Sequence, residues 1–76
     1  MNAVRAPAAN VLVWGQVAAA IVLVADGRYP QVVVSNIGDA ARLAAALRPD
    51  ADRCGVDLIV ETGADGATHD VVARRR

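Results

Sequence analysis

The 76-residue sequence has no phenylalanine, no lysine and a single cysteine, and aromatic residues make up only 3% of it. One cysteine, Cys54, excludes an internal disulfide, and such cysteine usage fits a reduced, cytoplasmic protein. Without phenylalanine the core must be aliphatic, with Trp14 and Tyr29 as the only large rings. The formal net charge of zero argues against a general nucleic-acid binder, which normally carries a basic excess.

Hydrophobic residues are abundant and make up 55% of the chain. A domain this small buries only about 60% of its unfolded surface, so it usually needs a disulfide, a metal or a partner. We therefore expect one domain over residues 10–76 that forms a homodimer, preceded by a loose lead-in over residues 1–9. All eight basic residues are arginine, which suggests the codon usage of a GC-rich genome, such as that of an actinobacterium or one of its phages.

The longest apolar run, residues 11–25, has three interpretations: a membrane anchor, a signal sequence or part of a soluble core. A spanning helix needs roughly 20 apolar residues, and no small-residue cleavage site follows the run. Valine, isoleucine and leucine instead favour β-strands. We predict two strands, residues 11–17 and 19–25, with one long strand bent near Gly15 as the alternative.

A loop over Asp26–Pro30 predicts a hairpin into a third strand, Gln31–Ser35, with Val24 opposite Val32. Both faces of this hairpin are apolar, whereas a half-exposed antiparallel sheet alternates apolar and polar residues. We therefore expect a helix on one face and a second copy of the chain on the other, related by a two-fold axis. The residues predicted to mediate this self-association are Trp14, Ile21, Leu23 and Val33.

A helix is predicted next, with Asn36 as its N-cap and Asp39 in its first turn. Apolar residues then recur at helical spacing from Ile37 to Leu47. Pro49 predicts the end of this helix, or the start of a second short turn that Gly55 would close.

The strand at residues 56–61 and the turn signal Asp65-Gly66 predict a second hairpin. Its expected pairs are Val60 with Val71, Leu58 with Ala73, Thr62 with His69, Asp57 with Arg74, Ile59 with Val72, and Glu61 with Asp70. The predicted fold is therefore α+β, a single antiparallel sheet of about five strands in the order β-β-β-α-β-β with one helix packed on one face.

Few residues suggest catalysis. The expected Glu61–Asp70 pair sets like charges together, which suggests paired carboxylates or half a cation site. The alternatives are an error in the predicted register, or a solvated edge at which Arg74–Arg76 and salt weaken the repulsion. Cys54 and His69 suggest a cysteine nucleophile with its base, but no catalytic signature surrounds Cys54, and a free cysteine is more often a small buried hydrophobe. We expect no catalytic residue, cofactor or metal, and keep a small enzyme or metal site around Glu61, His69 and Asp70 as an alternative.

Two surfaces are predicted to contact partners. Arg28, Tyr29 and Pro30 form a compact group in the first loop, and Ile59 and Val72 lie on the sheet; aromatic and arginine side chains are frequent in interfaces. These five residues are the predicted binding site for another protein.

The run Arg74-Arg75-Arg76 suggests contacts to phosphate, or a solvated tail. We expect a small non-enzymatic protein-interaction module that self-associates through its valine-rich sheet, such as a phage or mobile-element accessory protein, and no membrane association. The alternative is a nucleic-acid-binding protein that uses Arg28 and these three arginines.

Overall fold

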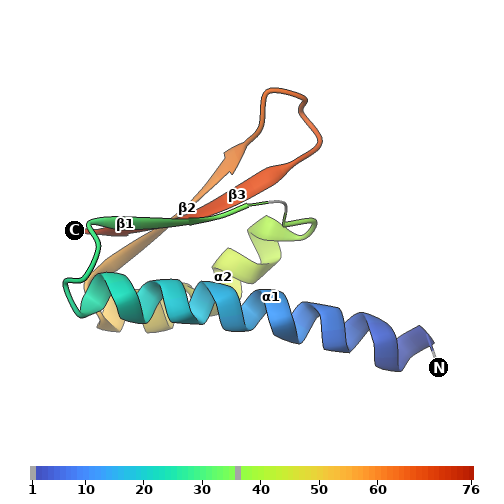
Figure 1. The fold of residues 1–76 in the computed structure, drawn as a ribbon, viewed down its shortest axis with the longest axis horizontal. Coiled ribbons are helices and arrows are strands. Elements are labelled where there is room, and N and C mark those ends of the chain that lie inside the picture. The colour runs from blue at the N-terminus through green and yellow to red at the C-terminus, as the bar shows by residue number, and fades with distance from the viewer. Residues whose placement is uncertain (1, 36) are drawn as a thin grey trace.

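A computed structural model describes residues 2–35 and 37–76 of the chain, with side chains from Val13 onward. The elements are α1 (Asn2–Ala25), β1 (Gln31–Val34), α2 (Ala40–Arg53), β2 (Val56–Thr62) and β3 (His69–Arg75). They form two layers, with both helices against the same face of a three-stranded sheet (Figure 1). The predicted α+β class fits this arrangement, but the prediction of five strands and one helix is wrong.

The sheet is antiparallel and has the order β1-β3-β2, so the last strand in sequence lies in the centre. The β2–β3 register runs from Val56 opposite Arg75 to Thr62 opposite His69, and it confirms all six predicted pairs. On the other edge, β1 pairs with β3 from Gln31 opposite Arg74 onward. Strands that follow one another along the chain therefore pair in the second hairpin only.

The predicted strands over residues 11–17 and 19–25 are wrong, because this run belongs to helix α1, which also includes residues 2–9 of the expected lead-in. Its fully buried residues, Val17, Ala20, Ile21 and Val24, recur three or four positions apart, as on one face of a helix. Alanine is the strongest helix former, and an apolar run alone does not separate a buried helix from a strand.

The expected hairpin between residues 19–25 and β1 is wrong for the same reason. Val32 lies opposite Ala73 of β3 and not opposite Val24. Among the described residues, no helix combines the length and the apolar character that crossing a membrane requires.

The core lies between the sheet and the two helices, and it is built from small aliphatic side chains, which let the layers approach closely. No polar or charged residue is buried among the described side chains. The buried core residues are Val17, Ala20, Ile21, Val24, Ile37, Ala40, Leu43, Ala44, Leu47, Ala51, Val56, Leu58, Val71 and Ala73.

Helix α2 confirms that a helix follows Asn36, but its start and its end differ from the predicted ones. It begins at Ala40 with Asp39 as N-cap, whose side chain makes no capping hydrogen bond; the predicted cap, Asn36, lies outside the described residues. The helix does not end at Pro49, because it continues to Arg53. Proline removes one helical hydrogen bond, but the fully buried Ala51 holds the last turn against the core.

Gly55 follows α2 with a φ of 72°, in the left-handed region where glycine is favoured. This position agrees with the predicted role of Gly55 in closing the last turn. The chain then enters β2 directly at Val56.

Two neighbouring alanines of α2 test the packing. Ala44 is fully buried and Ala45 is exposed. We expect Ala44→Leu to lower the free energy of unfolding by about 1–3 kcal/mol, because a filled core has no room for the added carbons. Ala45→Leu changes it by less than about 0.5 kcal/mol. Urea unfolding followed by circular dichroism measures both, and equal effects would contradict the assignment of the buried helix face.

Candidate functional site

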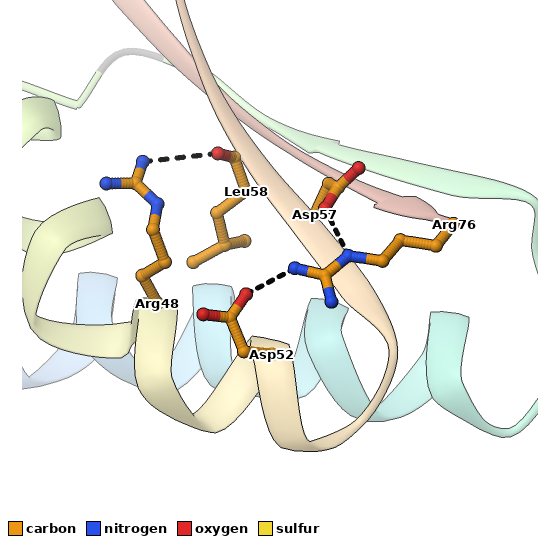
Figure 2. Close-up of polar contacts among 5 residues, drawn as sticks. All are labelled: Arg48, Asp52, Asp57, Leu58 and Arg76. Carbon is orange, nitrogen blue, oxygen red and sulfur yellow. Dashed lines mark hydrogen bonds and ion pairs between the residues drawn. The ribbon is translucent and has the colours of Figure 1, made fainter.

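The molecule has two unlike sides on either flank of the central strand β3. Helix α1 packs beneath β1 and β3, whereas α2 packs mainly beneath β2. In Figure 1, α1 lies in front of α2, and in the close-up of Figure 2, α2 and β2 lie in front of α1. Each side thus presents one helix and one edge strand to solvent.

Exposed large hydrophobic side chains, among those described, are confined to α1, β1 and the loop between them. They are Trp14, Val22, Tyr29 and Val33, with exposed fractions of 41%, 55%, 52% and 46%. Single exposed apolar residues are normal on a protein surface, whereas larger exposed apolar patches often mark interaction sites. We call these four residues, together with the outer edge of β1, the α1–β1 side.

The outer edge of β1 has backbone groups that point away from the sheet. Arg75 donates its backbone N–H to the Pro30 carbonyl at 3.2 Å. Backbone groups alternate in direction along an antiparallel strand, so Val32 and Val34 face β3, whereas Gln31 and Val33 face outward. No other strand of the described chain pairs with this edge.

The outer edge of β2 is occupied by a side chain of α2. The Arg48 guanidinium donates a hydrogen bond to the Leu58 carbonyl at 3.3 Å (Figure 2). Charged side chains placed at an edge strand are a common protection against pairing with another chain. We therefore call the β2 edge, where Arg48 binds the Leu58 carbonyl, the guarded edge, and the β1 edge the open edge.

Arg76 reinforces the guarded side. Its Nε donates to the Asp57 carboxylate at 2.6 Å, and its Nη2 donates to the Asp52 carboxylate (Figure 2). These contacts, first with Asp57 and then with Asp52, raise the pKa of Arg76 above its ordinary value. The residue that follows β3 thus ties β2 to the last turn of α2.

The three arginines that the sequence suggested for phosphate contacts point to different partners. Arg74 donates to the Gln31 side chain at 3.2 Å, and the Arg75 guanidinium lies beside Gly27, just after α1. Arg76 is held between two carboxylates. The arrangement is not one basic patch, and each side chain has a structural contact.

The sheet face opposite the helices carries an apolar row across all three strands, Val33, Val72 and Ile59. Val72 is only 1% exposed although no helix covers it, because its neighbours in the row stand directly beside it. Ile59 is half-buried. Of the two sheet residues predicted to bind a partner, Ile59 therefore offers surface, whereas Val72 offers almost none.

Charged residues flank this apolar row on both sides. Asp57 lies opposite Arg74 at one end, and Glu61 lies opposite Asp70 at the other. The expected Glu61–Asp70 register is thus correct. Among the described residues, no group of three or more histidine, cysteine, aspartate or glutamate side chains is placed to hold a metal ion.

The other predicted contact residues divide between surface and core. Arg28, Tyr29 and Pro30 are all exposed in the loop between α1 and β1. Ile21 is 4% exposed and belongs to the core, and Leu23 is half-buried. Trp14, Ile21, Leu23 and Val33 therefore do not form one exposed surface, because Ile21 lies in the core and Leu23 is half-buried, whereas Trp14 and Val33 are exposed.

Sequence reasoning missed the exposure of Val22. In the predicted strand, Val22 and Val24 share a face, but in α1 only Val24 is buried. A helical reading of residues 17–24 places Val22 off the buried stripe, so a period of 3.6 is the signal that would have found it.

Cys54 and His69, suggested as a nucleophile and its base, are not brought together. Cys54 is exposed just after the last turn of α2, whereas His69 lines a small hollow beside the first turn. A helix of this length separates the two by about 20 Å. His69 Nδ1 lies 3.4 Å from Thr62 Oγ1, while Glu61 and Asp70 do not line that hollow.

A larger hollow of about 330 Å³ lies between α1 and the start of α2. Trp14 and Leu43 line it, and so do Asp39 and Arg42, which form an exposed ion pair at 3.6 Å. It continues the α1–β1 side around the tryptophan, so the indole ring is open to solvent on one side.

The comparisons with known proteins match nothing. No family model, no curated protein and no solved structure is similar to this chain at a significant level. The surfaces described above are thus the observations from which a function can be argued.

The connection between β2 and β3 covers the six residues 63–68, so it is longer than the two-residue turn that Asp65-Gly66 predicts. Gly63 donates its N–H to the Thr68 carbonyl at 2.7 Å. The Asp65 carboxylate accepts hydrogen bonds from the N–H groups of Ala67 and Thr68 and from the Thr68 hydroxyl. These bonds, the Thr68 N–H first, hold the pKa of Asp65 below its ordinary value.

The hydrogen bonds to Asp65 predict that the stability of the fold depends on pH. The pKa of Asp65 is lower in the folded state than in the unfolded state. The ionised carboxylate therefore contributes folding stability above the ordinary aspartate pKa of about 4, and this stability is lost as the pH falls through the lower folded value. We expect Thr68→Val, which removes the hydroxyl donor, to raise the Asp65 pKa. A carboxyl-carbon NMR titration of both proteins measures the shift. An unchanged Asp65 midpoint would contradict the hydroxyl contact.

Proposed function

We propose that this chain is a small non-enzymatic protein-interaction module that self-associates through the α1–β1 side. The observation that carries the proposal is the confinement of Trp14, Val22, Tyr29 and Val33 to that side, beside the open edge of β1. Neither α2 nor β2 presents a comparable side chain among those described.

The size of the domain supports this proposal. A chain of 76 residues with an alanine- and valine-rich core gains little stability from that core alone, and small domains commonly add a partner. Each half-exposed valine that is covered by a second copy removes further apolar surface from water, at about 25 cal/mol per Å². Self-association thus supplies burial that the core of a single copy lacks.

Two further exposed surfaces are available to bind a different protein. The exposed Arg28-Tyr29-Pro30 loop and the sheet face around Ile59 combine apolar or aromatic groups with nearby charge. Such mixed surfaces are typical of non-obligate interfaces. We propose that these two surfaces contact a protein partner.

Substitution of one valine tests the self-association. We expect the wild-type chain at micromolar concentration to have twice its 7.8 kDa mass by light scattering and sedimentation. Val22→Asp places a charge on the α1–β1 side and is expected to shift the mass to that of a single copy, because an unpaired carboxylate is costly to bury.

Ala45→Asp is the matched control, since Ala45 is an exposed residue of the other helix. This variant should keep the mass of the wild-type protein, and circular dichroism should show the wild-type helix content in both variants. A wild-type chain that stays a single copy at 100-fold higher concentration refutes the proposal. So does equal dissociation by both substitutions.

A further inference from the structure

The open edge of β1 suggests how two copies meet, an inference that rests on the proposed self-association. The outward N–H and C=O groups of Gln31 and Val33 form a row at the sheet edge, and edge strands of this kind readily pair with another strand. The edge of β2 is less available for such pairing, because the Arg48 side chain already donates to the outward Leu58 carbonyl.

A second copy of β1 fits this edge better than an arbitrary strand does. The strand Gln31-Val32-Val33-Val34 has no charged residue, so two copies bring no like charges together. Turned antiparallel with Val33 opposite Val33, the strand places Val32 opposite Val34 of the second copy. Valine pairs of this kind stabilise neighbouring strands.

The two-fold axis through Val33 also agrees with the direction of the backbone. Val33 faces outward, so Val33 and its mate can exchange both N–H···O=C bonds across the axis. A register centred on Val32 places Val33 opposite Gln31 and leaves the exposed valine without an apolar neighbour. The register centred on Val33 is therefore the favoured one.

The helices support the same arrangement. Because α1 packs beneath β1, pairing the two β1 strands brings the two α1 helices side by side beneath the joined sheet. The long dimensions of the molecule, 39 by 28 Å, describe the side seen in Figure 1, where α1 lies in front. A side of that size can supply the roughly 800 Å² per partner that a stable interface buries.

We infer that two copies of this chain join by antiparallel pairing of β1 with β1, centred on Val33, into one continuous six-stranded sheet with both pairs of helices on the same face. The apolar row of each copy then continues across the axis through the two Val33 side chains. A second copy of this chain is the partner that the open edge accepts.

Cysteine cross-linking tests the register. Across such a pair the two Val33 Cα atoms lie about 5.5 Å apart, within the range of about 4.4–6.8 Å that a disulfide spans. We expect Val33→Cys in a Cys54→Ser background to form a covalent dimer under mild oxidation, with a yield above 80% at concentrations where the wild-type chain is dimeric. The wild-type protein, whose single exposed Cys54 lies after α2, is the matched control and should cross-link at least tenfold more slowly.

Gln31→Cys in the same background is the control on the same strand. The two Gln31 residues lie four positions out of register, about 14 Å apart along the strand, so they should not cross-link. Cross-linking of Gln31→Cys as fast as Val33→Cys overturns the register, and so does a dimer by light scattering in which Val33→Cys reacts no faster than Cys54.

Val33→Pro provides a second measurement that does not use cysteine. Proline removes the outward N–H but not the bonds that Val32 and Val34 make to β3, so it should weaken the dimer at least tenfold, whereas Val33→Thr retains the N–H and should not. A dimer unaffected by Val33→Pro overturns the strand pairing while the proposed self-association stands. A wild-type chain without any dimer overturns both, and leaves the edge to a strand of a different protein.

Discussion

Every other element of this fold depends on the central strand β3. Val71, Val72 and Ala73 are each 1% exposed, although successive side chains point to opposite faces of the sheet. The strands β1 and β2 pair only with β3 and not with each other. Both helices also pack against this strand, so the hydrogen bonds of β3 hold the α1–β1 side and the α2–β2 side in one domain.

The two edges of the sheet differ in the side chains that contact them, and this difference limits how copies can join in the proposed assembly. At the β2 edge, arginine side chains bind a strand carbonyl and two carboxylates. At the β1 edge, the strand carries only glutamine and valine. A sheet with two open edges can add copies without end, whereas one open edge allows a single symmetric pairing. If copies join as we propose, Arg48 limits that assembly to one edge, in addition to its local contact with Leu58.

The sequence predicted the register of the second hairpin correctly, because its two strands are neighbours along the chain and their side-chain patterns match on both faces. It failed for residues 11–25, because the exposed positions from Val13 onward are alanine, glycine, valine and tryptophan, with Gln16 as the only polar side chain among them, so the helix shows no polar stripe. For β1, the strand was predicted correctly, but its partner was not, since β3 follows it by some 35 residues and no local pattern records that pairing. Trp14 and Tyr29 were predicted as contact residues from their residue type, and Val33 from the second apolar face of a hairpin that does not form. The open edge that unites them depends on the strand order, which only the structure provides.

The place of β3 in the chain has a kinetic consequence. Gln31 pairs with Arg74, so β1 must wait for the last described strand before it can join a sheet. Contacts between distant parts of a sequence slow folding and lengthen the time for which apolar segments stay exposed. During synthesis on the ribosome, α1, β1 and α2 emerge before their common partner does. A nascent chain stalled before Val71 would therefore present a hydrophobic helix and a bare valine strand, the kind of segment that chaperones bind.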